Sequence, residues 1–328
     1  MRLALWLAAA ALPLAAQPKL LVNAKVETRS AAAGLEREFK AALASQPQPA
    51  WIAYSVPVLA GRSLGCEVVS PGGWSAPGVV HLEPPDRMVV LFRVEANAVE
   101  RVRTLSPDCE IDAGGLPVHW LADVRPAESV ALLAAMAPQR ERGGESLVSA
   151  LGLHADSAAD AVLERFVAAG QPEWLRQRAA FWLGAANGGR RFEILKGLLA
   201  TAPAEAVGQR AISGLAASRA AEATDLLISI ARQNKEARLR AQAVSALGRS
   251  SAPKAADAIN AALTNDPDSQ VRRRAVSALR SLPEGRGVPL LIQAAKTSRD
   301  ADVRKQAMSA LSQTRDPRAT AFFVEVLK

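Results

Sequence analysis

Apolar residues recur with one fixed spacing through the second half of the chain. An alanine stands every 32 residues, and a leucine follows each alanine four positions later. The alanines are Ala179, Ala211, Ala243, Ala275 and Ala307. A constant period of this length is typical of stacked supersecondary units, because one unit alone cannot bury its apolar face. The pattern therefore predicts a repeat architecture.

Each period contains two stretches of helical spacing separated by short polar breaks. In the first stretch, Val271, Ala275, Ala278 and Leu279 fall on one face of a helix. In the second stretch, apolar pairs recur at the same interval. They are Ile194-Leu195, Leu226-Leu227, Ala258-Ile259, Leu290-Leu291 and Phe322-Phe323. A weaker unit precedes them, as is usual for a terminal repeat, so we expect about six helix pairs over residues 145–328.

Residues 18–125 have a different texture. Stretches rich in β-branched and aromatic residues predict strands, and one stretch of helical spacing predicts a helix. The strands are expected at 19–26, 50–56, 78–82 and 87–94, and the helix at 32–44. Residues 94–100 predict the tip of a hairpin. We expect a small α+β domain, joined to the repeats by a helix and a loop over residues 126–144, with the loop at 138–144.

Three repeats begin with the same order of polar and apolar residues. Residues 266–279 read Asp-Pro-Asp-Ser-Gln-Val-Arg-Arg-Arg-Ala-Val-Ser-Ala-Leu, and similar starts lie at 236–243 and 301–307. This order resembles the HEAT-like repeat family named after phycobilisome lyases. The resemblance covers residues 145–328. It implies an all-α superhelical solenoid following the α+β domain.

Arginines occupy the opening turn of the first helix in four repeats. They are Arg176, Arg240, Arg272 and Arg304, while Gly208 stands in the remaining one. A cation there opposes the helix dipole by roughly 0.3–1 kcal/mol, so a compensating contact is expected. The resemblance implies a structural ladder that joins neighbouring units through acidic residues just upstream. These are Glu236, Asp268, Asp300 and Asp302. An anion-binding stripe, strongest near Arg273, Arg274 and Lys305, is the alternative.

The resemblance also implies a binding face. In HEAT-like stacks the second helices line the concave side, and their outward positions here are polar and of mixed charge. We expect the partner-binding residues to be Glu193, Lys196, Asp225, Asp257 and Asn260. Such a face suits a protein or peptide partner better than a nucleic-acid backbone, which calls for a continuous cationic trough.

The chain is basic, with a net charge of +8 and only 4% aromatic residues. A basic balance favours nucleic acid or an anionic envelope surface as a partner. Aromatic side chains for base stacking are scarce, so nucleic acid is the weaker candidate. An anionic envelope surface stays open as an alternative.

The N-terminus has the pattern of a secretory signal peptide over residues 1–16. Met1-Arg2 precedes an uncharged apolar run, Leu3 to Leu14, and small residues follow at Ala15 and Ala16. The run is shorter than the about 20 residues that a bilayer requires, and no later stretch is apolar enough to span one. We therefore expect an exported protein, periplasmic or extracellular, with no membrane span in the mature chain.

The two cysteines fit an oxidising compartment. Cys66 and Cys109 are the only pair and lie outside the repeats. A bridge between them would close a loop of roughly 40 residues and stabilise the fold by about 3–4 kcal/mol. Two buried thiols that pack as small apolar groups are the alternative.

The densest group of chemically versatile residues lies between Asp108 and His119. Three carboxylates, a thiol and an imidazole in twelve residues are compatible with a metal site or a Cys-His pair. The alternation around Ile111 equally predicts a strand with one wet face, a turn at Gly114-Gly115 and a packed His119. No P-loop, H-E-x-x-H or C-x-x-C motif occurs. Iron-binding relatives of the repeat family use His-Glu pairs, which this chain lacks, so we expect no cofactor.

These observations favour an exported, non-enzymatic scaffold that binds a protein or peptide through a HEAT-like solenoid. An enzyme or metal-dependent accessory factor using Asp108 to His119 is one alternative. A binder of anionic envelope surfaces, acting through the arginine-bearing turns, is the other.

Overall fold

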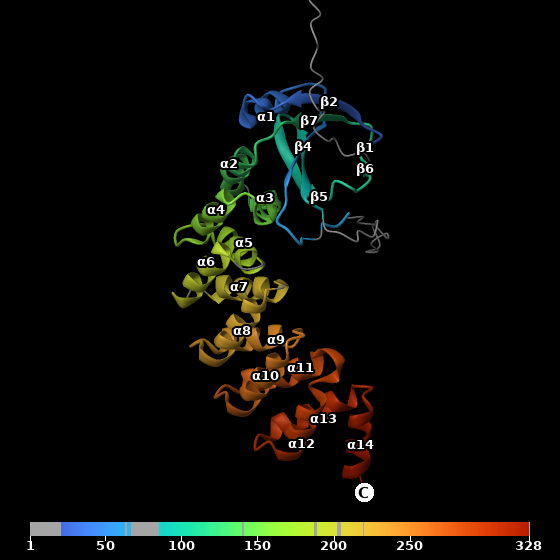
Figure 1. Ribbon diagram of the computed structural model, residues 1–328, viewed down its shortest axis with the longest axis vertical. Coiled ribbons are helices and arrows are strands. Elements are labelled where there is room, and N and C mark those ends of the chain that lie inside the picture. The colour runs from blue at the N-terminus through green and yellow to red at the C-terminus, as the bar shows by residue number, and fades with distance from the viewer. Residues whose placement is uncertain are drawn as a thin grey trace, which may run out of the picture. The chain divides into compact units, whose positions relative to one another are not determined.

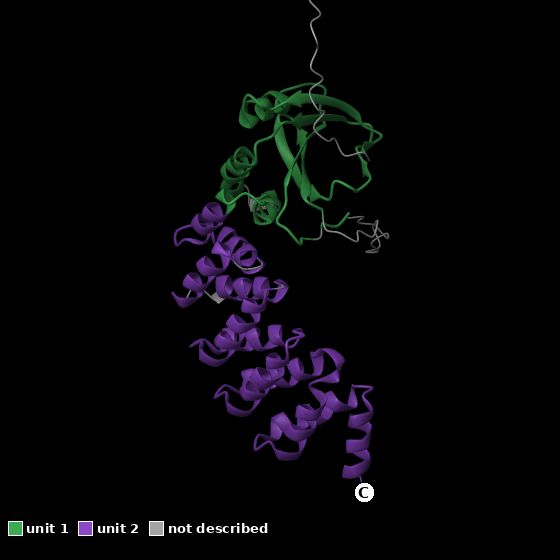
Figure 2. Ribbon diagram, in the orientation of Figure 1, with its two compact units in different colours: residues 1–159 green, residues 160–328 purple. Residues whose placement is uncertain are grey.

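A computed structural model describes residues 21–62, 64–66, 85–139, 141–186, 189–201, 205–218 and 220–327. The chain divides into two compact units, residues 1–159 and 160–328 (Figure 2). The predicted signal peptide and the predicted strand at 78–82 lie outside the described residues. Among the helices of the described ranges, none is both long and apolar enough to cross a membrane.

The first unit is built on a five-stranded mixed sheet with the order β2-β7-β3-β4-β5 (Figure 1). Strands β3, β4 and β5 are antiparallel neighbours, whereas β7 runs parallel to both β2 and β3. A separate parallel pair joins β1 to β6. The strands are β1 Leu21–Val22, β2 Lys25–Ser30, β3 Ala50–Pro57, β4 Arg87–Glu95, β5 Ala98–Leu105, β6 Ile111–Asp112 and β7 Pro117–Ala122. The helices are α1 Leu35–Leu43, α2 Pro126–Met136, the short 3-10 helix η1 Ala137–Gln139 and α3 Glu141–Leu153.

Apolar side chains cover both faces of the central strands. On the face toward α1 and α2, the ring of Phe92 packs 4.9 Å from Phe39 and 5.8 Å from Tyr54, measured between centroids. On the opposite face, Val89 and Trp120 belong to a second buried cluster. Burial on both faces explains why β4 reads as a continuous apolar run rather than an alternating one.

Two features of this unit differ from the sequence prediction. The predicted strand around 108–112 shrinks to Ile111–Asp112, and the main strand of this region is β7, which the sequence analysis did not predict. Five of the six β7 residues are buried, so the strand shows no alternation to detect. The predicted loop at 138–144 is wrong as well, because η1 and the start of α3 occupy it. Gly143, at φ +87°, interrupts regular helix geometry there.

In the described part of the chain, α5 to α14 form five successive helix pairs, and α3 and α4 precede them. The bounds of those after α3 are α4 Ala158–Val167, α5 Glu173–Gly184, α6 Arg190–Ala200, α7 Glu205–Ala217, α8 Ala221–Gln233, α9 Ala237–Leu247, α10 Pro253–Asn265, α11 Ser269–Ser281, α12 Val288–Thr297, α13 Ala301–Ser312 and α14 Pro317–Val326. A short 3-10 helix, η2 Pro283–Gly285, precedes α12. Below, the "first helices" are α5, α7, α9, α11 and α13, and the "second helices" are α6, α8, α10, α12 and α14. Successive first helices pack against one another along the stack (Figure 1).

The recurring alanines form the continuous interior of this stack. All five have no exposed surface, and the leucines four positions later are almost fully buried. Neighbouring first helices approach to backbone contact: a Cβ atom on Gly184 would lie 2.5 Å from the carbonyl oxygen of Ala211. One on Gly248 would lie 2.8 Å from that of Ala278. The predicted solenoid is therefore confirmed, and small residues are what allow its first helices to pack so closely.

Candidate functional site

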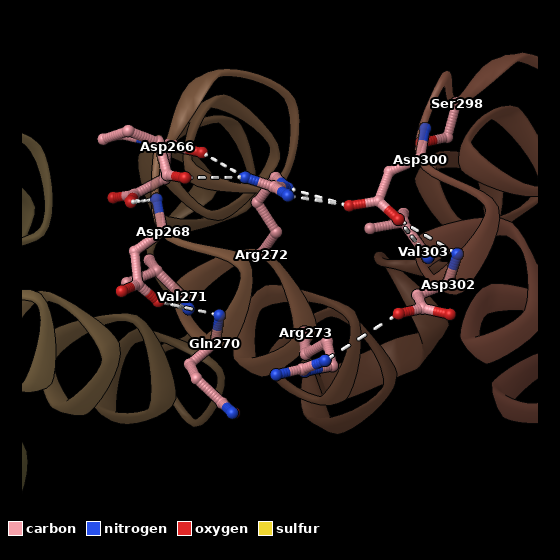
Figure 3. A network of polar contacts seen from close by, with 11 residues as sticks. Asp266, Asp268, Gln270, Val271, Arg272, Arg273, Ser298, Asp300, Asp302 and Val303 are labelled. Atoms are coloured by element: carbon pink, nitrogen blue, oxygen red, sulfur yellow. Dashed lines mark hydrogen bonds and ion pairs between the residues drawn. The ribbon is translucent and has the colours of Figure 1, made fainter.

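Two arginines of the predicted ladder join neighbouring repeats through aspartates. Arg240, on α9, donates to both carboxylate oxygens of Asp266, with Nε 2.8 Å from Oδ2 and Nη2 3.0 Å from Oδ1. Arg272, on α11, donates from Nε and Nη2 to Oδ2 of Asp300, at 3.1 and 2.8 Å (Figure 3). Each pair connects a first helix to the loop that leads into the next repeat.

The same arginines complete the C-terminal ends of the preceding second helices. Nη1 of Arg240 lies 2.9 Å from the carbonyl oxygen of Asn234, the residue that caps α8. Nη1 of Arg272 lies 2.8 Å from the carbonyl oxygen of Asp266. Nη1 of Arg304 lies 2.7 Å from the carbonyl oxygen of Ser298. The last carbonyls of a helix have no partner within it, and they carry the negative end of its dipole. A guanidinium placed there is attracted by the negative end of the preceding helix dipole. This attraction offsets its unfavourable position at the positive end of its own helix.

Aspartates at the same loops serve the helices that follow. Oδ1 of Asp300 accepts from the amides of Asp302 and Val303, so Asp300 caps α13 while its other oxygen accepts from Arg272. These hydrogen bonds hold the pKa of Asp300 below its usual value, and the bond from Arg272 has the largest effect. Burial alone would raise the pKa of Asp266. Its bonds from Arg240 and from the Asp268 amide outweigh this effect, so the pKa is lowered.

The other ladder positions make different contacts. Nε of Arg176 donates to the carbonyl oxygen of Val167 at 3.3 Å, at the end of the preceding helix α4. Asp268 caps α11 through the amides of Gln270 and Val271, and the acidic partner of Arg240 is Asp266, a residue that the sequence analysis passed over. Asp302 reaches the exposed side of α11, where its carboxylate lies 3.9 Å from Arg273.

At Gly208, where the ladder lacks its arginine, a Cβ atom would lie 3.0 Å from the side chain of Leu239. Glu236 provides the N-cap position of α9 but no side-chain cap.

The expected partner-binding residues lie on the second helices. Glu193, Lys196, Asp225 and Asp257 are exposed, and Asn260 is half-buried. Their charges are largely matched: Lys196 lies 3.2 Å from Glu193, and Lys254 of the next repeat contacts Asp225. Grooves open between α4 and α6 and between α10 and α12. One, of about 830 Å³, includes Glu193, and another, of about 560 Å³, includes Asn260.

A more polar groove lies on the side of the first helices, chiefly between α9 and α11. Its volume is about 670 Å³. Three guanidiniums line it, from Arg238, Arg273 and Arg274, together with one carboxylate, that of Asp268. The side chains of Gln209, Gln242, Gln270 and Gln306 extend the lining from α7 to α13. We name this feature the arginine groove.

Part of the arginine groove has a recurring signal in the sequence. The residue immediately before each recurring alanine is polar and projects from the buried stripe. These residues are Arg178, Arg210, Gln242, Arg274 and Gln306, of which Gln242, Arg274 and Gln306 line the groove. The sequence predicts a basic cluster near Arg273 and Arg274 at the turns, whereas the structure places both side chains in a groove across the first helices.

The segment from Asp108 to His119 does not converge on a single site. Cys109 forms a disulfide with Cys66, with Cα atoms 5.4 Å apart, so neither sulfur is a free thiol and the Cys-His alternative is wrong. Asp112 accepts from the Gly114 amide at 2.7 Å. In the described part of the chain, no three histidine, cysteine or carboxylate groups gather as a metal site would require.

His119 lies on β7 and its side chain is buried. Its Nε2 lies 3.1 Å from the hydroxyl of Ser45, and its Nδ1 lies 3.2 Å from a carboxylate oxygen of Glu27. Burial lowers the pKa of His119, with the nearby Arg29 adding to the effect. The imidazole therefore has the contacts of a packed side chain.

The spacing Gly-x-Ser-x-Gly also occurs at residues 61–65, but Ser63 lies outside the described residues.

Part of the helical stack is similar to a known repeat family. Residues 192–280 and 256–328 match the family model described as HEAT repeats. No curated protein matches the chain. Two solved structures are similar over more than half of it. Human deoxyhypusine hydroxylase in complex with glycerol is 17% identical, with 56% of this chain and 84% of that chain covered and a TM-score of 0.28. The complex of CpcE and CpcF of phycocyanin lyase from Nostoc sp. PCC7120 is 23% identical, with coverages of 58% and 76% and a TM-score of 0.30. At these TM-scores neither likeness bears on function.

Proposed function

We propose that the chain is a scaffold that binds another protein through its helical stack, of which residues 192–328 match the family model of HEAT repeats. Stacked helix pairs expose long surfaces made of many repeats, and such surfaces suit extended protein partners. The observation that carries the proposal is that different positions of each repeat have different structural roles. Alanines and leucines build the interior and the arginine-aspartate ladder fixes the loops, while the outward polar positions of both helices have neither role.

The polar residues of the second helices stay candidates for this binding face. They are Glu193, Lys196, Asp225, Asp257 and Asn260, and the grooves beside Glu193 and Asn260 give a partner side chain room to enter. A mixed charge pattern of this kind favours a specific protein partner over a uniform polyanion.

A photo-crosslinking residue placed at single positions of the full chain tests the scaffold proposal. Asp257 and Arg274 sample the two sides of the stack, and exposed Glu36 on α1 samples the sheet unit. Crosslinks to a discrete protein in cells of the source organism are expected from the stack positions and not from Glu36. Equal labelling at all three positions, or no protein adduct at any exposed stack position, would refute the proposal.

We further propose that the protein works in an oxidising compartment outside the cytoplasm. The pattern of residues 1–16 and the disulfide support this. Intact mass and N-terminal sequencing of the chain from its own cells are expected to show a start at Gln17 and no thiol available to alkylation without a reductant. An intact Met1 with two free thiols would contradict the proposal.

A further inference from the structure

The first unit has a recess where its parallel strands end. Its volume is about 290 Å³, and its lining includes Ser55, Arg87, Trp120, Ala122, Asp123 and Val124. We name it the strand-end pocket. We propose that it binds a small zwitterion, an α-amino acid, through one positive and one negative side chain that form no ion pair with each other. This inference goes beyond the scaffold function, which concerns the helical stack, because the lining belongs to the sheet unit.

The topology of the sheet brings the lining together. Strands β2, β7 and β3 run parallel, so their carboxyl ends, at Ser30, Ala122 and Pro57, lie at one edge of the sheet. Strand β4 is antiparallel to β3 and begins at this edge with Arg87, which pairs with Pro57. Asp123 follows β7 directly. The edge at the carboxyl ends of parallel strands is the common position for ligands in open α/β sheets, and the strand-end pocket lies there.

The guanidinium of Arg87 is half-buried and is held by one residue of the neighbouring strand. Its Nε donates to the Ser55 hydroxyl at 3.0 Å, and its Nη2 donates to the Ser55 carbonyl oxygen at 2.8 Å. Neither acceptor carries a charge. Within the described part of the chain, no carboxylate forms an ion pair with Arg87, and its Nη1 has no acceptor. Charged groups shielded from water are normally paired, so this guanidinium is available to an incoming carboxylate.

The carboxylate of Asp123 is held by a serine as well. The hydroxyl of Ser30, at the end of β2, donates to its Oδ2 at 2.7 Å. Among the described residues, no donor reaches its Oδ1 and no cation pairs with it. Its backbone has φ +57°, a left-handed conformation that aspartate tolerates better than most residues do. Arg87 and Asp123 therefore present opposite charges to one recess without neutralising each other.

Two opposite charges that stay unpaired favour a ligand that carries both charges itself. The Nη1 and Nη2 edge of Arg87 faces away from Ser55 and can give a carboxylate two parallel hydrogen bonds. The free Oδ1 of Asp123 can accept from an ammonium group. A ligand with a single charge would be attracted by one of these side chains and repelled by the other.

The volume and the apolar part of the lining limit the size of the ligand. A water molecule occupies about 30 Å³ in the liquid, so the pocket has room for roughly ten non-hydrogen atoms. Amino acids up to about the size of leucine fit this volume. Trp120 and Ala122 belong to the apolar cluster on this face of the sheet, and they offer an apolar side chain a surface to contact.

Other small ligands suit the lining less well. Phosphate would be attracted by Arg87 but repelled by Asp123. A metal ion would find one carboxylate in the lining and a guanidinium beside it, which is a poor set of ligands. A simple amine would face the opposite conflict, with attraction from Asp123 and repulsion from Arg87.

Isothermal titration calorimetry of the full chain with L-leucine tests the proposal. Saturable binding is expected, with a dissociation constant below about 1 mM. L-leucinamide lacks the carboxylate, and N-acetyl-L-leucine lacks the ammonium group. Each derivative is expected to bind at least about tenfold more weakly than L-leucine, because one charge of the pocket then has no partner.

Two variants test the assigned side chains. Arg87→Met and Asp123→Asn are each expected to weaken L-leucine binding by about tenfold or more, and circular dichroism checks that each variant is folded. Arg101→Met and Glu100→Gln are the matched controls. They remove exposed charges of the same two signs from β5, and neither residue lines the pocket. Both controls are expected to leave L-leucine binding unchanged.

Several outcomes would overturn the proposal. One is the absence of saturable binding for L-leucine, L-alanine and L-serine up to about 5 mM. Another is equal affinity for L-leucine and either single-charged derivative, a comparison that uses the unchanged chain and so does not depend on the folding of a variant. A loss in the two controls equal to that in Arg87→Met and Asp123→Asn would overturn it too. Crosslinking of the stack tests the scaffold function separately, so either proposal can fail while the other stands.

Discussion

Replacing Arg240 with methionine tests whether the arginine ladder stabilises the stack. The side chain of Arg240 is 11% exposed and that of Asp266 is 5% exposed, so their ion pair is largely shielded from water. Methionine has similar bulk but cannot donate a hydrogen bond. It would leave the Asp266 carboxylate with the Asp268 amide, at 2.9 Å, as its main donor. It would also remove the donor of the Asn234 carbonyl at the end of α8.

The expected loss follows from these contacts. Breaking a fully buried pair by removing one partner costs about 3–5 kcal/mol, whereas an exposed pair contributes about 0–1 kcal/mol. The near-complete shielding of Asp266 places this pair between the two, at about 2–3 kcal/mol. The carbonyl hydrogen bonds add about 0.5–1 kcal/mol. We therefore expect the free energy of unfolding to fall by about 3 kcal/mol.

Urea denaturation followed by circular dichroism at the helical band measures this change. Arg249→Met is the matched control, because Arg249 is exposed and outside the ladder, and it should change stability by less than about 0.5 kcal/mol. The double variant Arg240→Met/Asp266→Asn is expected to lose less than the sum of its single changes, since no charge is then stranded. A loss for Arg240→Met no larger than that of the control would show that the ladder does not stabilise the stack.

Three further outcomes are expected. Gly184→Ala should destabilise the stack by about 1–3 kcal/mol in the same assay, because the new methyl group meets the Ala211 carbonyl; an unchanged midpoint would contradict the close helix approach. Reducing the Cys66–Cys109 bridge, which links residues 43 positions apart, should cost about 4 kcal/mol, measured by denaturation with and without reductant. Hydrogen bonds from the guanidinium and the backbone amide of Arg318 lower the pKa of Asp316 to about 2. Its contribution to stability should therefore be complete above the unfolded value of 3.8 and vanish as the pH falls toward 2. The variant Asp316→Asn should lack this part of the loss of stability when unfolding is measured as a function of pH. An acid transition identical to that of the unchanged protein would show that Asp316 does not contribute to it.

The repeat interior could be predicted because its physical rule is local and periodic. One helix pair repeats the same contacts with the next, so burial of Ala211 implies burial of Ala243 and Ala275. The central strand β7 could not be predicted in the same way. Its residues are buried on both faces by segments far away in the sequence, and a short apolar run of this kind has no period of its own.

The candidate sites divide along the same line. The ladder arginines were visible from their recurring position in the first helices, but their partners depended on how the loops fold. Asp266, two residues before the N-cap of α11, receives Arg240, and the carbonyls at the ends of the second helices receive the remaining donors. Sequence spacing alone favoured Asp268, which instead caps its own helix.

The sequence by itself determined that this protein contains a stack of paired helices, because a fixed apolar period can be satisfied only by units that bury one another. Which outward residues gather into a groove was decided by the tertiary structure. Arg238 and Arg274 are 36 residues apart and share no local pattern. They line one recess only because glycine and alanine let neighbouring first helices approach to backbone contact, and that approach is a property of the packed stack.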